Sequence, residues 1–435
     1  MMNLYVVLKE NVKKLVDKGA VHILVGNFLT RFVNLFGTIC LVRILTKQEY
    51  GTLGYVENLY GFLYLLVGLG LNNAIMRYVL LENSLDKKYS VFFYIVKKGS
   101  IYNLIIMCIG FLINYVYPHP TEFSDGEILL YMIILIMPFA FYIEITFSNE
   151  RAFFNNKTYI YLSIATTSGI IISKILGGIT FGVKGVIIFY GIFEAFAGVI
   201  CILYEKHKYY RKQQQSKLKK SLRRSIDIYG MQYMLTNSLW SMFLLLDVFM
   251  LAQLLNSEEA VADYKVAYTI PACLSILSGA IGMFVSPYFI KNEKNKLWVR
   301  KNYILCFLIT FIVVFIVALL IGIFSKQIVI LLYGKNYLNI VPLMRVLLLA
   351  AVANAGLRFT TANILASIGE VRYNLFVSAI AIVMQVVVNL YMIPHYGILG
   401  PAITSICSYV FMGVTLFFIF NRKYEILNLN NIFKG

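Results

Sequence analysis

Polar and charged side chains recur inside long apolar stretches of this sequence. In the stretch of residues 26–45 the polar residues are spaced three and four apart, at Asn27, Thr30, Arg31, Asn34 and Thr38. This spacing places them on one face of a helix. A guanidinium inside a membrane cannot lose its proton and costs at least ~3 kcal/mol against lipid, so it requires water, a carboxylate or an anionic ligand. We therefore expect Arg31, with Asn27 and Asn34, to contact an anionic substrate. The alternative is a structural ion pair.

A second polar face is predicted in the apolar stretch that begins at residue 226. It carries Tyr229, Gln232, Tyr233, Thr236, Asn237 and Trp240, with Asp247 two turns further along. Asn237 and Trp240 are predicted to line a wet cavity, since an aromatic face suits the apolar side of a sugar ring. The basic residues Arg77, Lys174 and Arg358 are predicted to join this substrate site. For each, the alternative is a buried salt bridge or a helix-end position.

Carboxylates inside apolar stretches suggest a second kind of chemistry. Glu57, Glu144 and Asp247 are candidates to carry a proton or a sodium ion, or to neutralise the buried cations. Glu194 is interpreted as structural. No metal site is predicted, because the four histidines are isolated in sequence and the six cysteines occur singly, without a C-x-x-C pair. No cofactor is predicted either.

These side chains require helices that cross a membrane. The chain has 435 residues, of which 60% are hydrophobic and only 14% are charged, whereas a soluble protein is roughly one-quarter charged. Apolar runs of about 20 residues, long enough to cross a ~30 Å hydrocarbon layer, recur about twelve times. The sequence thus predicts an all-α polytopic membrane protein with about twelve transmembrane helices.

Net charge is +18, which in a soluble protein would suggest nucleic acid as a partner. Here the basic residues mark topology instead. With a cytoplasmic N-terminus, roughly 28 of the 39 Lys and Arg fall in inner segments and about 6 in outer ones. We expect both termini in the cytoplasm, no nucleic acid partner, and membrane lipids, including anionic lipids of the inner leaflet, as neighbours.

A basic polar segment near the midpoint divides the chain into two halves. The predicted parts are an interfacial amphipathic helix (1–19), a six-helix bundle (20–204), a basic cytoplasmic linker (205–225), a second six-helix bundle (226–421) and a cytoplasmic tail (422–435).

The two halves repeat each other. FGVKG at 181–185 and YGILG at 396–400 are 215 residues apart, and the same offset pairs Lys157 with Arg372. LLNSEEAVADYKVAY at 254–268 likewise echoes ILTKQEYGTLGY at 44–55. An even number of crossings per half makes the repeats parallel, so we expect a pseudo-twofold axis along the membrane normal. This is a transporter arrangement, in which rocking of the halves alternates access to a site between them.

With these residues in view, the chain resembles the bacterial Wzx-like flippases for O-antigen and capsule repeat units, in the polysaccharide transport branch of the multidrug/oligosaccharidyl-lipid/polysaccharide (MOP, MATE-like) exporter superfamily. The ordered motifs that carry the resemblance are LVRILTKQEYGTLGY (41–55), GLGLNNAIMRY (68–78), Asp247 followed by YKVAY, VSPYF (285–289), LLYGKNY (331–337) and NLYMIPHYGILGPAIT (389–404).

The resemblance implies a V-shaped pair of six-helix bundles with a cationic central cavity. It also implies an undecaprenyl-diphosphate-linked oligosaccharide as the substrate, carried from the cytoplasmic to the outer leaflet of the bacterial inner membrane. Hydrated sugars and a diphosphate would lose many hydrogen bonds in hydrocarbon, so a carrier must supply a wet, positively charged route. Arg31 would anchor phosphate or an acidic sugar. Glycan polymerase or assembly proteins are candidate partners, and H⁺ or Na⁺ is the candidate coupling ion.

Two other functions remain open at the level of sequence. A drug or small-solute exporter of the same superfamily would share the fold. However, exporters of that kind typically carry an acidic coupling residue in the first helix, where this chain has only Arg31 and Arg43 as charges. A membrane glycan polymerase or ligase is the second alternative. The predicted outer loops are short, and no G-x-S-x-G, H-E-x-x-H or P-loop pattern occurs, so we expect a transporter rather than an enzyme.

Overall fold

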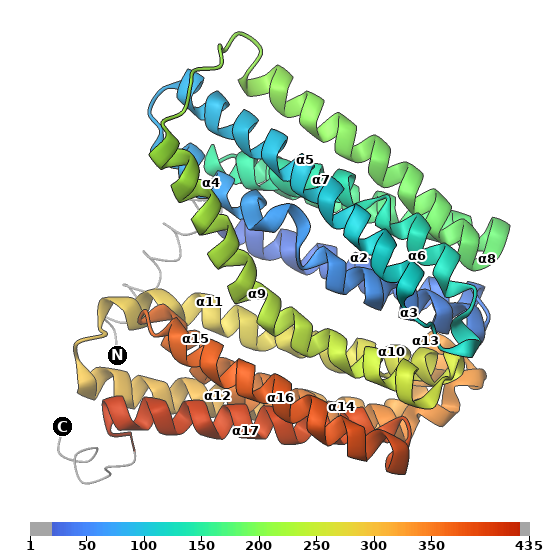
Figure 1. The fold of residues 1–435 in the computed structure, drawn as a ribbon. Helices are drawn as coiled ribbons and strands as arrows, with labels where there is room; N and C mark the ends of the chain where they lie inside the picture. The colour runs from blue at the N-terminus through green and yellow to red at the C-terminus, as the bar shows by residue number, and fades with distance from the viewer. Residues whose placement is uncertain (1–19, 427–435) are drawn as a thin grey trace. The chain divides into compact units, whose positions relative to one another are not determined.

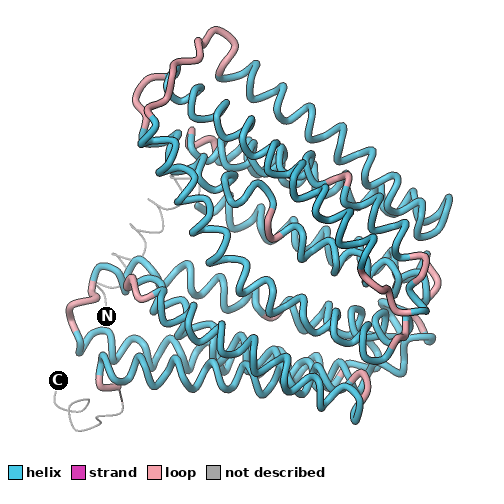
Figure 2. Tube along the Cα trace, viewed as in Figure 1, coloured by secondary structure: helices cyan, strands magenta, loops and turns pink. Residues whose placement is uncertain are grey.

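The computed structural model describes residues 20–426, and every element in that range is a helix (Figure 2). The predicted interfacial helix 1–19 and the end of the predicted tail lie outside the described residues. The chain divides into two compact units. Unit 1 runs to His119 and continues over Ser124–Ser238, and unit 2 comprises Pro120–Phe123 and the chain from Leu239 onward.

Unit 1 is built from helices of the first half of the chain (Figure 1). They are α2 (Ala20–Ile44), α3 (Lys47–Tyr64), η1 (Val67–Gly70), α4 (Leu71–Leu81), α5 (Leu85–Val116), α6 (Gly126–Ile134), α7 (Met137–Ala152), α8 (Asn156–Tyr209) and the first half of α9 (Lys220–Leu255). Within this unit α8 packs against both α2 and α7.

Unit 2 contains the second half of α9, the helices that follow α9, and η2 from an earlier part of the chain. They are η2 (Thr121–Phe123), α10 (Glu258–Cys273), α11 (Ser275–Lys291), α12 (Lys296–Ile323), α13 (Ser325–Tyr333), η3 (Lys335–Ile340), α14 (Val341–Val352), η4 (Ala353–Arg358), α15 (Phe359–Ser367), α16 (Val371–Tyr396) and α17 (Leu399–Tyr424). Helices α16 and α17 lie side by side (Figure 1).

Length and composition identify the membrane-crossing helices. In the described part of the chain eight helices are long and apolar enough to cross a membrane, and two bent pairs, α3 with η1 and α4 and α6 with α7, bring the number to ten. Helix α8 has 54 residues, roughly 81 Å at 1.5 Å per residue, which is more than two crossings of a ~30 Å layer. Counting α8 twice and adding α2 gives about twelve crossings, so the predicted fold class is confirmed.

Glycine produces the breaks that the repeat predicts. Helix α8 is kinked at Gly182 (φ 60°, ψ −144°), and α16 ends at Gly397 (φ 57°, ψ −132°). These two positions are 215 residues apart, and they share a left-handed conformation that glycine adopts without the Cβ clash of other residues. The backbone therefore repeats where the sequence repeats.

Polar caps start equivalent helices in the two halves. Thr46 and Glu49 form a capping box at the start of α3, and the hydroxyl of Ser257 accepts from the backbone N–H of Ala260 at the start of α10. Each cap satisfies amide donors that have no partner within the helix. The two loops that echo each other in sequence are thus both helix starts.

Both ends of the predicted linker (205–225) belong to helices, and only its middle is non-helical. Helix α8 continues to Tyr209 and α9 begins at Lys220, so the non-helical segment covers residues 210–219. That segment contacts the start of α5. The backbone N–H of Gln214 donates to Asp86 at 3.2 Å, and the backbone N–H of Ser216 donates to the hydroxyl of Ser90 at 2.9 Å.

The first half of α9 packs within unit 1. Lys98 of α5 pairs with Asp227 at 2.5 Å, and Tyr78 of α4 donates to the backbone carbonyl of Ser225 at 3.0 Å. At Gly70 (φ 72°) the backbone of η1 comes so close to α9 that a Cβ would lie 2.3 Å from the carbonyl oxygen of Gly230. Only glycine fits this crossing.

Replacement of Gly70 tests this contact. Gly70→Ala should lower the free energy of unfolding by about 1–3 kcal/mol, because the new methyl group overpacks a backbone crossing and the residue must keep a positive φ. The measurement is the melting temperature of the purified protein in detergent. Gly279→Ala is the matched control, since no heavy atom lies within 4 Å of its added Cβ. A control-like melting temperature for Gly70→Ala would contradict the close approach.

Candidate functional site

The polar face of α2 is exposed at Arg31. Arg31 and Asn34 are both exposed, and no hydrogen bond or ion pair joins Arg31 to another described residue. Phe28, Phe32 and Phe36 of the same helix are also exposed, at 55%, 56% and 61%. Arg31 is therefore a cation without a protein counterion in this part of the chain. Asn27 lies one turn earlier in α2, and its side chain is outside what the structure describes.

Arg77 of α4 lies against aromatic rings. Its guanidinium carbon is 4.9 Å from the ring centre of Tyr229 and 5.9 Å from that of Tyr78. A ring face attracts a cation but supplies no negative charge, so the hydrogen-bonding capacity of this exposed guanidinium remains open to a ligand. Asn237, two turns beyond Tyr229 on α9, is exposed as well.

Lys174 and Glu57 form an ion pair in unit 1. The ammonium of Lys174 in α8 lies 2.8 Å from the carboxylate of Glu57 in α3, with side-chain exposures of 16% and 30%. Lys174 also lies 4.5 Å from the ring centre of Tyr190. The structure thus brings together two residues that the sequence assigned to different roles, one to substrate binding and one to ion coupling.

Two further carboxylates of unit 1 form no ion pair with a described cation, although Lys174 is near enough to Glu194 to interact with it. Glu144 in α7 accepts hydrogen bonds from the hydroxyl of Tyr64 and the amide of Asn72. Glu194 in α8 is only 5% exposed, and its Oε2 has no hydrogen-bond partner. Burying an ionised carboxylate without a counterion is expensive, so a proton or a bound cation would stabilise both groups.

Asp247 is the centre of a polar cluster in unit 2. Its side chain is buried, and its two oxygens accept four hydrogen bonds from neutral donors. Gln385 (2.8 Å) and Asn389 (3.0 Å) donate to Oδ1, and Tyr264 (3.0 Å) and Ser405 (2.8 Å) donate to Oδ2. No ion pair with a cation accompanies them among the described residues, so the carboxylate is solvated by dipoles alone.

Arg358 is the buried cation of unit 2. It lies at the end of η4, a π-helical turn, and is 9% exposed. Its Nη1 donates to the amide oxygen of Asn354 at 2.8 Å, and its guanidinium carbon is 3.8 Å from the ring centre of Trp240. The structure therefore brings together Trp240 and Arg358, which the sequence placed separately in the predicted substrate site. Neither contact supplies a negative charge.

Unit 2 keeps its buried charges apart. The donors to Asp247 are all neutral, and none of them is Arg358. Arg358 in turn makes no ion pair with a described residue. A purely structural role would favour direct pairing of the two, since each would neutralise the other. Their separation leaves the carboxylate suited to a cation and the guanidinium suited to an anion.

Sequence reasoning did not identify the neutral partners of these charges. Gln385 and Asn389 are four residues apart in α16, so their spacing alone placed them on one helix face. Nothing in the sequence indicated that this face would meet Asp247, which lies about 140 residues earlier. Asn354 lies one turn before Arg358, and this spacing could have predicted the hydrogen bond between them.

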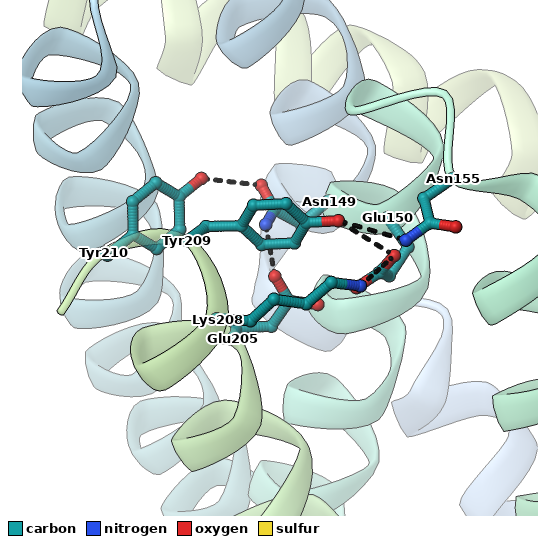
Figure 3. Close-up of polar contacts among 7 residues, drawn as sticks. All are labelled: Asn149, Glu150, Asn155, Glu205, Lys208, Tyr209 and Tyr210. Atoms are coloured by element: carbon teal, nitrogen blue, oxygen red, sulfur yellow. Dashed lines mark hydrogen bonds and ion pairs between the residues drawn. The ribbon is translucent and has the colours of Figure 1, made fainter.

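A further polar cluster ties the end of α8 to α7 in unit 1 (Figure 3). Its members are Asn149, Glu150, Asn155, Glu205, Lys208, Tyr209 and Tyr210. Lys208 lies 2.8 Å from Glu150, Tyr210 donates to the amide oxygen of Asn149 at 3.0 Å, and the amide of Asn149 donates to Glu205. This cluster fixes where α8 ends and the 210–219 segment begins.

No group of three or more His, Cys, Asp or Glu side chains in the described range could hold a metal ion.

Comparison with known proteins gives the context of these charges. Residues 16–293 match a family model described as polysaccharide biosynthesis protein. An uncharacterized membrane protein of Methanocaldococcus jannaschii is 25% identical, and the alignment covers 95% of this chain and 85% of that protein.

Solved structures share the fold. The lipid II flippase MurJ in an inward closed conformation is 13% identical with a TM-score of 0.74, covering 94% of this chain and 90% of that one. An inward-facing multidrug resistance MATE family transporter of the MOP superfamily is 14% identical with a TM-score of 0.69, covering 92% and 96%. At these identities the likeness concerns architecture, and it confirms the predicted MOP/MATE-like arrangement of helices.

The Asp247 cluster yields a stability prediction. Asp247→Ala should destabilise the protein by at least about 1–3 kcal/mol, because it leaves buried donors without an acceptor. Asp247→Asn should cost less, since one amide oxygen still accepts. Both are measured as melting temperatures in detergent, with Asp125→Asn, an exposed helix-start residue, as the control. Equal melting temperatures for Asp247→Ala and the control would disprove the cluster.

Proposed function

The chain belongs to the polysaccharide biosynthesis protein family, and from that premise we propose that it is a flippase for a lipid-linked oligosaccharide. In this proposal an undecaprenyl-diphosphate-linked repeat unit moves from the cytoplasmic to the outer leaflet of a bacterial inner membrane by alternating access through a cationic cavity. Both termini would be cytoplasmic, and glycan polymerase or assembly proteins would be neighbouring partners.

The observation that carries the proposal is the buried guanidinium of Arg358. It is 9% exposed, it has one neutral hydrogen bond, and it stacks on Trp240. A guanidinium with free N–H donors in an apolar surrounding binds phosphate strongly, because the hydrogen bonds are charge-assisted and can be bidentate. A diphosphate headgroup offers such acceptor oxygens.

The exposed residues of unit 1 support the same substrate. Arg31 has no counterion among the described residues, and Arg77 meets only rings. With Asn27, Asn34 and Asn237 they would supply cationic and amide donors to phosphate and sugar hydroxyls. Lys174, paired with Glu57, would contact substrate only if that ion pair opened.

Aromatic groups suit the sugar part of the substrate. Trp240 is partly buried and offers one ring face to Arg358. An indole or phenol ring beside polar donors can cover the apolar side of a pyranose while the hydroxyls keep hydrogen bonds. In this way one site would recognise both a charged headgroup and a neutral glycan.

Arginine substitutions test the substrate site. Arg358→Ala and Arg31→Ala should each lower the rate of flipping, and for Arg358 the loss should be roughly 10- to 100-fold, as expected for a lost charge-assisted hydrogen bond. Lysine at either position should restore part of the rate, because a point charge lacks the bidentate fork. The assay is complementation of a flippase-null strain, followed by flipping of labelled lipid-linked repeat unit in proteoliposomes.

Lys335→Ala is the matched control, since it removes an exposed cation from η3 and should leave flipping unchanged. Wild-type protein that exports cationic drugs but does not move the labelled lipid would refute the flippase proposal and favour a drug exporter. Wild-type flipping rates in both alanine variants would be compatible with a flippase but would exclude the two arginines from its substrate site.

Coupling to H⁺ or Na⁺ would use the carboxylates that lack a cation. Asp247→Asn and Glu144→Gln should weaken the dependence of flipping on a sodium or proton gradient, because an amide cannot exchange a proton or balance a cation. Glu57→Gln should have a smaller effect, since Glu57 already pairs with Lys174. Rates are compared with sodium replaced by choline and with the proton gradient collapsed. A gradient response that is unchanged in all three variants would exclude these residues.

A further inference from the structure

A second buried guanidinium lies far from Arg358 in sequence, at Arg300 in the second turn of α12. Its side chain is 5% exposed, and neither Nε nor Nη2 has a hydrogen-bond partner. No described residue forms an ion pair with it. Buried guanidinium donors are normally satisfied, so these nitrogens require an acceptor that residues 20–426 do not supply.

The contacts of α12 define what surrounds this group. One turn after Arg300, Tyr303 packs on Phe420 of α17 with ring centres 4.4 Å apart. One turn before it, Lys296 lies 3.9 Å from Glu425 just after α17. Positions 296, 300, 303 share one face of the helix, so Arg300 lies on the side of α12 that faces the end of α17.

One carboxylate at this end of unit 2 already has cationic partners. Glu370, before α16, accepts from Lys423 at 2.6 Å and from Arg372 at 3.2 Å. The hydrogen bond from Lys423 lowers the pKa of Glu370 below its ordinary value, so the group is ionised and satisfied. Glu425 is exposed and pairs with Lys296, and Glu293 is exposed as well. None of these three carboxylates forms an ion pair with Arg300 among the described residues.

The rest of this end of unit 2 is rich in cations. Exposed basic residues occur here at Lys291, Lys294, Lys296, Lys301, Arg372 and Lys423. Three of them pair with Glu370 or Glu425, and the remaining surplus of basic residues favours an anion. Phosphate fits best, because its oxygens match the planar fork of a guanidinium and can accept from Nε and Nη2 together.

We propose that Arg300 is the anchor of a phosphate-binding site at the α11–α12 end of unit 2, separate from the substrate site around Arg358. The phosphate comes from an anionic lipid headgroup or from free phosphate, which the same nitrogens would bind in the same way. Occupancy of the site would fasten the start of α12 to the end of α17.

The test uses the purified full-length protein with two probes. Native mass spectrometry measures retention of phosphatidylglycerol against phosphatidylcholine, and thermal unfolding measures protection by inorganic phosphate. Arg300→Gln should lower phosphatidylglycerol retention or phosphate protection roughly tenfold, as the loss of a charge-assisted contact predicts. Arg300→Lys should be intermediate, because it keeps the charge but not the fork.

Lys301→Gln is the control for a non-specific loss of charge, since Lys301 is the exposed neighbour of Arg300. An Arg300-dependent effect with phosphatidylglycerol alone identifies a lipid headgroup as the source, and an effect with inorganic phosphate identifies the free ion. Binding that falls equally in Lys301→Gln, or that never depends on residue 300, overturns the proposal. If Arg300→Gln does not fold, wild-type binding by Arg300→Lys overturns it instead.

Discussion

A charge inside a membrane-crossing helix must be compensated, and this protein does so in more than one way. Unit 1 pairs Lys174 with Glu57 at 2.8 Å and gives Glu144 neutral donors, Tyr64 and Asn72. Unit 2 surrounds Asp247 with neutral donors and stacks Arg358 on Trp240. Because direct pairing would neutralise both charges of unit 2 at once, keeping them apart preserves one site for a cation and another for an anion. In the proposed function, Asp247 would take the coupling ion and Arg358 the phosphate.

Glycines interrupt the helices that carry these groups. Gly182 and Gly397 take the same left-handed conformation at equivalent points of the repeat. Gly70 permits the close crossing of η1 with α9. Such breaks let apolar segments turn or bend between crossings, and they also set the rotation of the following helix. The orientation of each polar face therefore depends on a few backbone positions as well as on side-chain packing.

Buried charges in this protein differ in how far their hydrogen bonds are satisfied. In the cluster at the end of α8, Lys208 pairs with Glu150 and Tyr210 donates to Asn149 (Figure 3), and one atom, Glu205 Oε1, is left without a partner. Arg300, in contrast, keeps two enclosed nitrogens without acceptors. Leaving a buried donor without an acceptor costs more free energy than one satisfied hydrogen bond contributes. A ligand therefore gains most binding free energy by accepting from such donors.

The sequence by itself determined the class of the protein, because apolar length and charge asymmetry follow directly from the properties of a bilayer. It also determined the repeat, since Gly182 and Gly397 recur at a fixed offset, and it marked Arg31 and Arg358 as charges that need an explanation. Only the tertiary structure decided which charges meet. The partners of Asp247 come from three other helices, and contacts between helices depend on how whole faces pack, which the spacing within one helix does not specify.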